Sequence, residues 1–128
     1  MGPAGERSPR ASPPPRPLTL ARVAAIAPDL MFASRIEGTL GAAGHQVTLS
    51  PSLSEASLDD ADLLVADLET EPPEAVVGLG IPVLGYYSHV NVDVKQAADA
   101  AGVDLAVPRS RMAREMPALV ERLLSGPG

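Results

Sequence analysis

The chain has 128 residues, the usual length of one domain, and its net charge of −6 argues against nucleic acid or anionic membrane as a general partner. Aromatic residues make up only 2% of the chain and cysteine is absent, which excludes base-stacking platforms, disulfides and thiolate metal sites. Because the sequence has neither a signal peptide nor an apolar run long enough to span a membrane, we expect a cytoplasmic protein without membrane contact.

Residues 1–17 contain six prolines and, after Met1, no large apolar residue. Such a segment cannot bury enough surface to offset the entropy of ordering it, so we predict a disordered tail. Its proline cluster could form a polyproline II stretch for a partner, but an inert tail is the simpler interpretation. The remaining residues, 18–128, are predicted to form a single domain.

Five short apolar runs, which predict strands, alternate with segments of helical periodicity. The predicted strands are 22–27, 46–49, 63–67, 82–86 and 104–107. The predicted helices are 30–43, a short turn at 54–60, 74–79, 92–101 and a last helix with Met112, Met116, Leu119, Val120 and Leu123 on one face. Continuous apolar strands indicate a parallel sheet covered by helices on both faces. With right-handed crossovers, this pattern favours a three-layer, flavodoxin-like α/β fold with strand order 2-1-3-4-5.

Several residues mark the expected ends of helices. Asp29 stands at the N-cap of the first helix, and Gly44 and Gly102 stand just after two helices, where glycine is favoured. Pro117 is expected in the first turn of the last helix, where its missing N–H costs little. His45, which follows Gly44, is expected to have a partly exposed ring.

Four segments resemble the receiver domain of bacterial response regulators. They are VAAIAPDLMFASRIEGTLGAAGHQVT, ADLLVADLE, IPVLGYYSH and AAGVDLAVPRSRM, which match the receiver's five strands in order. The resemblance runs from Arg22 to about Leu124 and implies a CheY-like fold. It also implies that Asp67, at the end of the third strand, is equivalent to the aspartate that accepts phosphate in two-component phosphorelays.

The metal-binding positions that the resemblance implies are mostly lost. Receivers hold Mg²⁺ with an acidic pair after the first strand, where this chain has Ala27 and Pro28. Asp29 is the only carboxylate left there, so Asp67 would have to share an ion with Asp29 or Glu69. Mg²⁺ needs an octahedral oxygen shell anchored by carboxylates. We therefore expect weak Mg²⁺ binding at Asp29 and Asp67 and no other cofactor.

Two further pocket positions depart from the receiver pattern. Tyr87 stands where receivers have Thr or Ser, with Ser88 next to it, and Arg109 stands where they have Lys. An arginine can hold a carboxylate bidentately, so a standing pair of Arg109 and Asp67 would blunt the nucleophile and imitate a locked state.

These features favour a stand-alone pseudo-receiver, a signalling and protein-interaction module that is not an enzyme. Its partner would be a histidine kinase or another signalling protein. Two alternatives stay open. The chain could be an active phosphorelay receiver phosphorylated on Asp67, or a flavodoxin-like domain that binds a small anion with Arg109, Tyr87 and His89.

Overall fold

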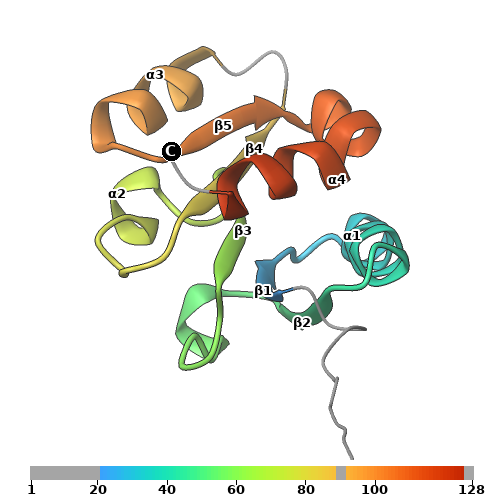
Figure 1. Cartoon of the computed structure of the whole chain (residues 1–128). Helices are drawn as coiled ribbons and strands as arrows, with labels where there is room; N and C mark the ends of the chain where they lie inside the picture. Colours follow the sequence, from blue (N-terminus) through green and yellow to red (C-terminus); the bar gives the residue numbers. More distant parts are fainter. Residues whose placement is uncertain (1–20, 89–91, 126–128) are drawn as a thin grey trace, which may run out of the picture.

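The computed structural model describes residues 21–88 and 92–125. The predicted tail and His89 lie outside these residues. Five parallel strands form one sheet in the order β2-β1-β3-β4-β5, as predicted (Figure 1). The strands are β1 (Arg22–Ile26), β2 (Gln46–Ser50), β3 (Leu63–Asp67), β4 (Val83–Tyr87) and β5 (Leu105–Pro108). Each agrees with its predicted range to within about one residue.

Helices cover both faces of the sheet, which makes three layers (Figure 1). One face packs against α1 (Leu30–Ala42) and α4 (Arg109–Leu124), and the other against α2 (Pro73–Val76) and α3 (Val92–Ala101). Successive residues of a strand point to opposite faces, so β1, β3, β4 and β5 each contribute to both apolar clusters, while the edge strand β2 contributes only Val47, on the α1 side. No helix in the described part of the chain combines the length and the apolar character that crossing a membrane requires.

The ends of α1 follow from local chemistry. Asp29 is the N-cap, and its Oδ1 accepts the backbone N–H groups of Met31 and Phe32 at 3.0 and 3.2 Å. Gly44 has φ 99° and donates to the Gly41 carbonyl, while the N–H of His45 bonds to the Leu40 carbonyl. This pair of bonds is a Schellman motif. The predicted cap and terminating glycine are therefore confirmed.

The same motif corrects the expectation for His45. Its ring is buried, and neither ring nitrogen has a hydrogen-bond partner. In a Schellman motif the residue after the glycine usually makes an apolar contact with the last turn of the helix. His45 occupies that inward position, which explains why the ring is not exposed as predicted.

The position predicted for Pro117 is wrong. Helix α4 begins at Arg109, directly after β5, so Pro117 lies in its interior. An interior proline loses one backbone hydrogen bond and costs about 3 kcal/mol. The buried apolar face continues on both sides of it through Met112, Met116 and Leu119, and this burial outweighs the local cost.

Two short helices are shorter than predicted. The segment predicted at 54–60 is only a 3₁₀ turn, η3 (Leu53–Glu55), and the Leu53 N–H bonds to the Glu71 carboxylate at 2.8 Å. Helix α2 ends at Val76, and two following glycines, Gly78 and Gly80, have φ of 75° and 84°. The C-cap Val77 is already extended, with φ −96° and ψ 163°, and the left-handed glycines after it cannot resume an α-helix.

Candidate functional site

The ends of β1, β3 and β5 bring the polar residues of the site to one edge of the sheet. Asp67 is the last residue of β3, Asp29 follows β1 after a two-residue loop, and Arg109 directly follows β5. Carboxyl ends of parallel strands share an edge, where doubly wound folds place their ligand sites. Asp67 is only 5% exposed, so its carboxylate is held within the protein rather than in bulk water.

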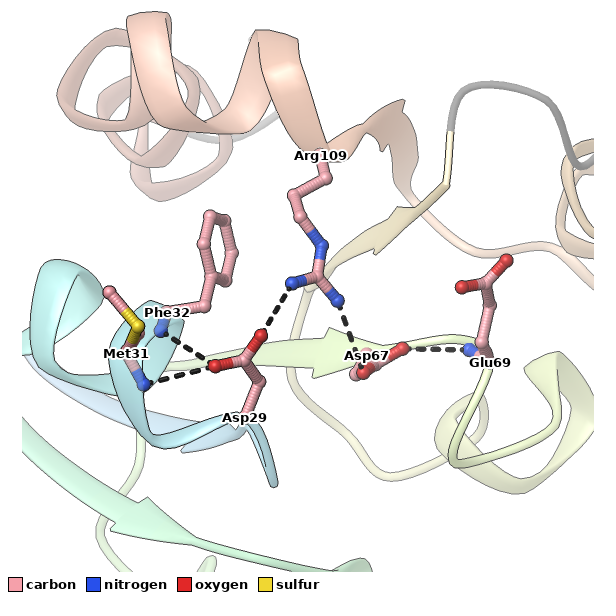
Figure 2. A network of polar contacts seen from close by, with 6 residues as sticks. All are labelled: Asp29, Met31, Phe32, Asp67, Glu69 and Arg109. Carbon is pink, nitrogen blue, oxygen red and sulfur yellow. Dashed lines mark hydrogen bonds and ion pairs between the residues drawn. The ribbon is translucent and has the colours of Figure 1, made fainter.

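Arg109 connects the two carboxylates. Its Nη1 lies 3.0 Å from Asp29 Oδ2, and its Nη2 lies 3.8 Å from Asp67 Oδ2 (Figure 2). The predicted bidentate pair with Asp67 is not formed, because the guanidinium divides between two partners. Asp29 is fixed by its cap bonds, so one of its oxygens serves α1 and the other serves Arg109.

Two aromatic rings pack against the Arg109 guanidinium. Arg109 Cζ lies 4.8 Å from the ring centre of Phe32 and 5.4 Å from that of Tyr86. The two ring centres are themselves 4.8 Å apart. Both distances from Arg109 are within the range of cation–π attraction. Arg109 is therefore restrained by two carboxylates and two rings.

The surroundings of the carboxylates differ. The hydrogen bond from the Phe32 N–H lowers the pKa of Asp29 below its ordinary value, and the hydrogen bond from Arg109 lowers it further. This exposed carboxylate therefore stays ionised at neutral pH. Asp67 Oδ1 accepts the Glu69 N–H at 2.9 Å. The Glu69 carboxylate stands apart from Arg109, with no contact drawn between them, so it is not part of the bridge (Figure 2).

The residues present do not fit the Mg²⁺ site of a receiver. Asp29 and Asp67 both contact the same guanidinium, and Ala27 and Pro28 offer no side-chain oxygen. Across residues 21–88 and 92–125, no group of three or more histidine or acidic side chains could hold a metal ion. A divalent ion would have to displace Arg109 from both carboxylates and would find only two anionic ligands.

The structure places Tyr86, not Tyr87, in the site. Tyr87 packs in the apolar cluster on the α3 side of the sheet, so the expectation that it lines the pocket is wrong. Tyr86 pairs in register with Asp67 and faces α1 and α4. Counting one residue further along a strand moves a side chain to the opposite face. Ser88 follows β4 and lines an open pocket beside Arg109.

Phe32 and Tyr86 were not singled out by the sequence, although signals for both exist. Phe32 belongs to the predicted apolar face of α1, and its proximity to the cap residue Asp29 places it near the sheet edge. Tyr86 lies one strand over from Asp67. The sequence predicts both as core residues. In the structure they are buried, and their rings also contact the Arg109 guanidinium.

The Tyr86 hydroxyl is buried and has no hydrogen-bond partner among residues 21–88 and 92–125. Burial, with a further contribution from the Asp67 charge, raises the pKa of Tyr86 above its ordinary value. The phenol therefore stays neutral in the folded state. Because the unfolded chain ionises this group first, stability should fall as the pH rises past about 10.

Replacing Tyr86 by Phe should leave the protein equally stable or more stable, by up to about 1 kcal/mol. The ring keeps its contacts with Phe32 and Arg109, and the variant no longer buries an unsatisfied hydroxyl. Urea denaturation of the two proteins measures the difference. A loss of more than about 1 kcal/mol would show that the hydroxyl makes a stabilising bond, since phenylalanine differs in nothing else.

A close contact behind the site restricts the shape of β4. Leu68, which follows Asp67, packs its side chain over Gly85 of β4. A Cβ added at Gly85 would lie 2.5 Å from Leu68 Cδ1 and 2.7 Å from its Cγ. Gly85 thus leaves space for the side chain that holds the end of β3 against the sheet.

Solved structures with the same fold are receiver domains. A response regulator receiver domain protein from Clostridium thermocellum superposes with a TM-score of 0.72 at 14% identity, over 83% of this chain and 95% of that one. CheY4, a chemotaxis response regulator of Vibrio cholerae, gives 0.69 at 18% identity, over 82% and 99%. The chain therefore has the CheY-like receiver fold. Neither family models nor curated proteins match its sequence.

The same fold also occurs as part of a longer protein. NtrX from Brucella abortus, crystallised with ADP, matches with a TM-score of 0.72 at 15% identity over 82% of this chain. This chain spans only 27% of the length of NtrX. The receiver fold is therefore found both alone and joined to further domains.

Proposed function

We propose that this chain is a receiver-like signalling module with a degenerate phosphorylation pocket, and that it acts by binding a partner protein rather than by catalysing a reaction. The bridge that Arg109 makes between Asp29 and Asp67 carries this proposal. In receivers, Mg²⁺ and a lysine neutralise the acidic pocket. Here one fixed guanidinium performs that role permanently.

The bridge opposes phosphorylation for two reasons. Phosphoryl transfer to a carboxylate depends on positioning and on neutralising the charge of the phosphoryl group, which is largely the work of the metal ion. The site offers no third carboxylate to recruit that ion. In addition, Asp67 is buried and faces a cation, so an incoming phosphodonor has to displace Arg109 before the carboxylate can attack.

A partner surface lies beside the bridge. Leu30 and Met31, the first residues of α1, are 82% and 85% exposed. They directly follow Asp29, so a protein that covers them would also contact the edge of the site. These two adjacent, largely exposed apolar side chains support contact with a histidine kinase or another signalling protein, because covering them removes apolar surface from water.

The phosphodonor test addresses this proposal directly. Wild-type protein incubated with acetyl phosphate and Mg²⁺ should gain no phosphoryl group detectable by intact-mass spectrometry. A variant carrying both Pro28→Asp and Arg109→Lys should label faster, because it regains a carboxylate beside Asp29 and loses the guanidinium bridge. Pro28 is exposed, so an aspartate is tolerated there.

Asp67→Asn is the matched control for both proteins. Stoichiometric, Mg²⁺-dependent labelling of the wild type that disappears with Asp67→Asn would reject the degenerate pocket. The chain would then be an active phosphorelay receiver.

A further inference from the structure

A second site lies on the α4 side of the bridge. It is an open pocket of about 490 Å³ between α1, the end of β4 and the start of α4. Its volume falls in the range of small-molecule sites, roughly 300–1,000 Å³. The lining residues are Phe32, Arg35, Ser88, Arg109, Ser110 and Ala113. They include two arginines and two serines but no carboxylate.

The two arginines leave donors available to a ligand. Arg35, in the second turn of α1, is exposed, and its guanidinium makes no ion pair or hydrogen bond with any residue in the described ranges. Arg109 uses Nη1 and Nη2 for the bridge, while its Nε has no acceptor among those residues. The first turn of α4 contains no acidic side chain that could compete. Asp29 and Asp67 offset the charge of Arg109, so Arg35 supplies the uncompensated positive charge of the pocket, while Arg109 adds a free N–H donor.

We propose that this pocket binds a small molecule that carries a phosphate monoester. A phosphate dianion presents several acceptor oxygens, which two guanidinium groups and the hydroxyls of Ser88 and Ser110 can share. A single carboxylate has only two oxygens, which one arginine can bind bidentately, so it would not need the second arginine. The remaining volume, beside Ala113 and the edge of Phe32, accommodates the organic part of the ester. The proposal goes beyond the signalling function and needs neither phosphorylation of Asp67 nor a protein partner.

Binding can be measured on the full chain with glycerol 3-phosphate, which does not transfer its phosphoryl group to a carboxylate. A titration followed by ¹⁵N-correlation NMR and calorimetry should give saturable one-to-one binding, with the largest amide shifts at Arg35, Ser88 and Ser110. Glycerol, which lacks the charge, should not bind. Arg35→Gln should weaken binding roughly tenfold, the usual effect of losing one charge-assisted contact with phosphate.

Arg114→Gln is the matched control. Arg114 is on α4, whose first turn lines the pocket, and its side chain is 67% exposed, but it does not line the pocket itself, so its removal should leave the affinity unchanged. Equal losses in Arg35→Gln and Arg114→Gln would mean general attraction to a basic surface and would overturn the proposal. Absence of saturation, or inorganic phosphate binding as tightly as the ester, would overturn it as well.

Discussion

Replacing Arg109 by Met should lower the free energy of unfolding by about 2 kcal/mol. Methionine keeps the apolar stem but removes the cation from a carboxylate, Asp67, whose side chain is only 7% exposed. Removing one partner of a fully buried ion pair leaves the other charge unpaired and costs about 3–5 kcal/mol. The cost of Arg109→Met should be smaller, because Arg109 is partly exposed and its Nη2 lies 3.8 Å from Asp67 Oδ2. Loss of the two ring contacts adds about 0.5–1 kcal/mol.

Arg114→Met provides the comparison, since the only ion pair of Arg114 with a described residue is the exposed one with Glu115. It should change stability by less than about 0.5 kcal/mol. Chemical denaturation of both variants, and of each combined with Asp67→Asn, yields a double-mutant cycle. Asn can still accept the Glu69 N–H through its side-chain oxygen, so the substitution removes the negative charge and keeps this bond. If Arg109→Met costs the same with Asp67 and with Asn at that position, the bridge to Asp67 does not contribute to stability.

Gly85→Ala should destabilise the protein by about 1–2 kcal/mol. The new methyl group would lie 2.5 Å from a buried leucine, Leu68, so either the side chain or β4 has to move. Overpacking of this kind costs about 1–3 kcal/mol, and the lower backbone entropy of alanine in the unfolded chain offsets about 0.4–1 kcal/mol of that. Thermal or urea denaturation measures the net change in the free energy of unfolding.

A glycine-to-alanine change at Gly41 is a control, because it should change the stability in the opposite direction. It lies in α1 with nothing within 4 Å of an added Cβ, so Gly41→Ala should stabilise by about 1 kcal/mol. Adding Leu68→Ala to Gly85→Ala should cost less than the two single changes summed, because the new methyl occupies part of the vacated space. Strict additivity would show that Leu68 and Gly85 are not in contact.

Most of the fold was predictable because its signals are local. Continuous apolar runs located all five strands, and Asp29, Gly44 and Gly102 marked helix ends through their own backbone preferences. The errors arise where tertiary packing overrides such signals. The buried face of α4 continues past Pro117.

The candidate site was predictable in its residue types but not in its pairing. Sequence position brings Asp67 and Arg109 to the same edge, yet it does not show that Asp29 takes one end of the guanidinium. That contact depends on where the cap residue points its second oxygen. Which of Tyr86 and Tyr87 faces Arg109 depends on the exact register of β4, which a continuous apolar run leaves undefined.

The contact between Asp29 and Arg109 also bears on how the chain folds. The two residues are 80 positions apart, and α4 is the last helix in the part of the chain that the structure describes. The cluster that buries α1 is completed by α4, so neither this apolar layer nor the bridge can form before the C-terminal helix docks. Contacts of such high sequence separation slow folding. During synthesis, the pocket can therefore assemble only after the residues of α4 have left the ribosome.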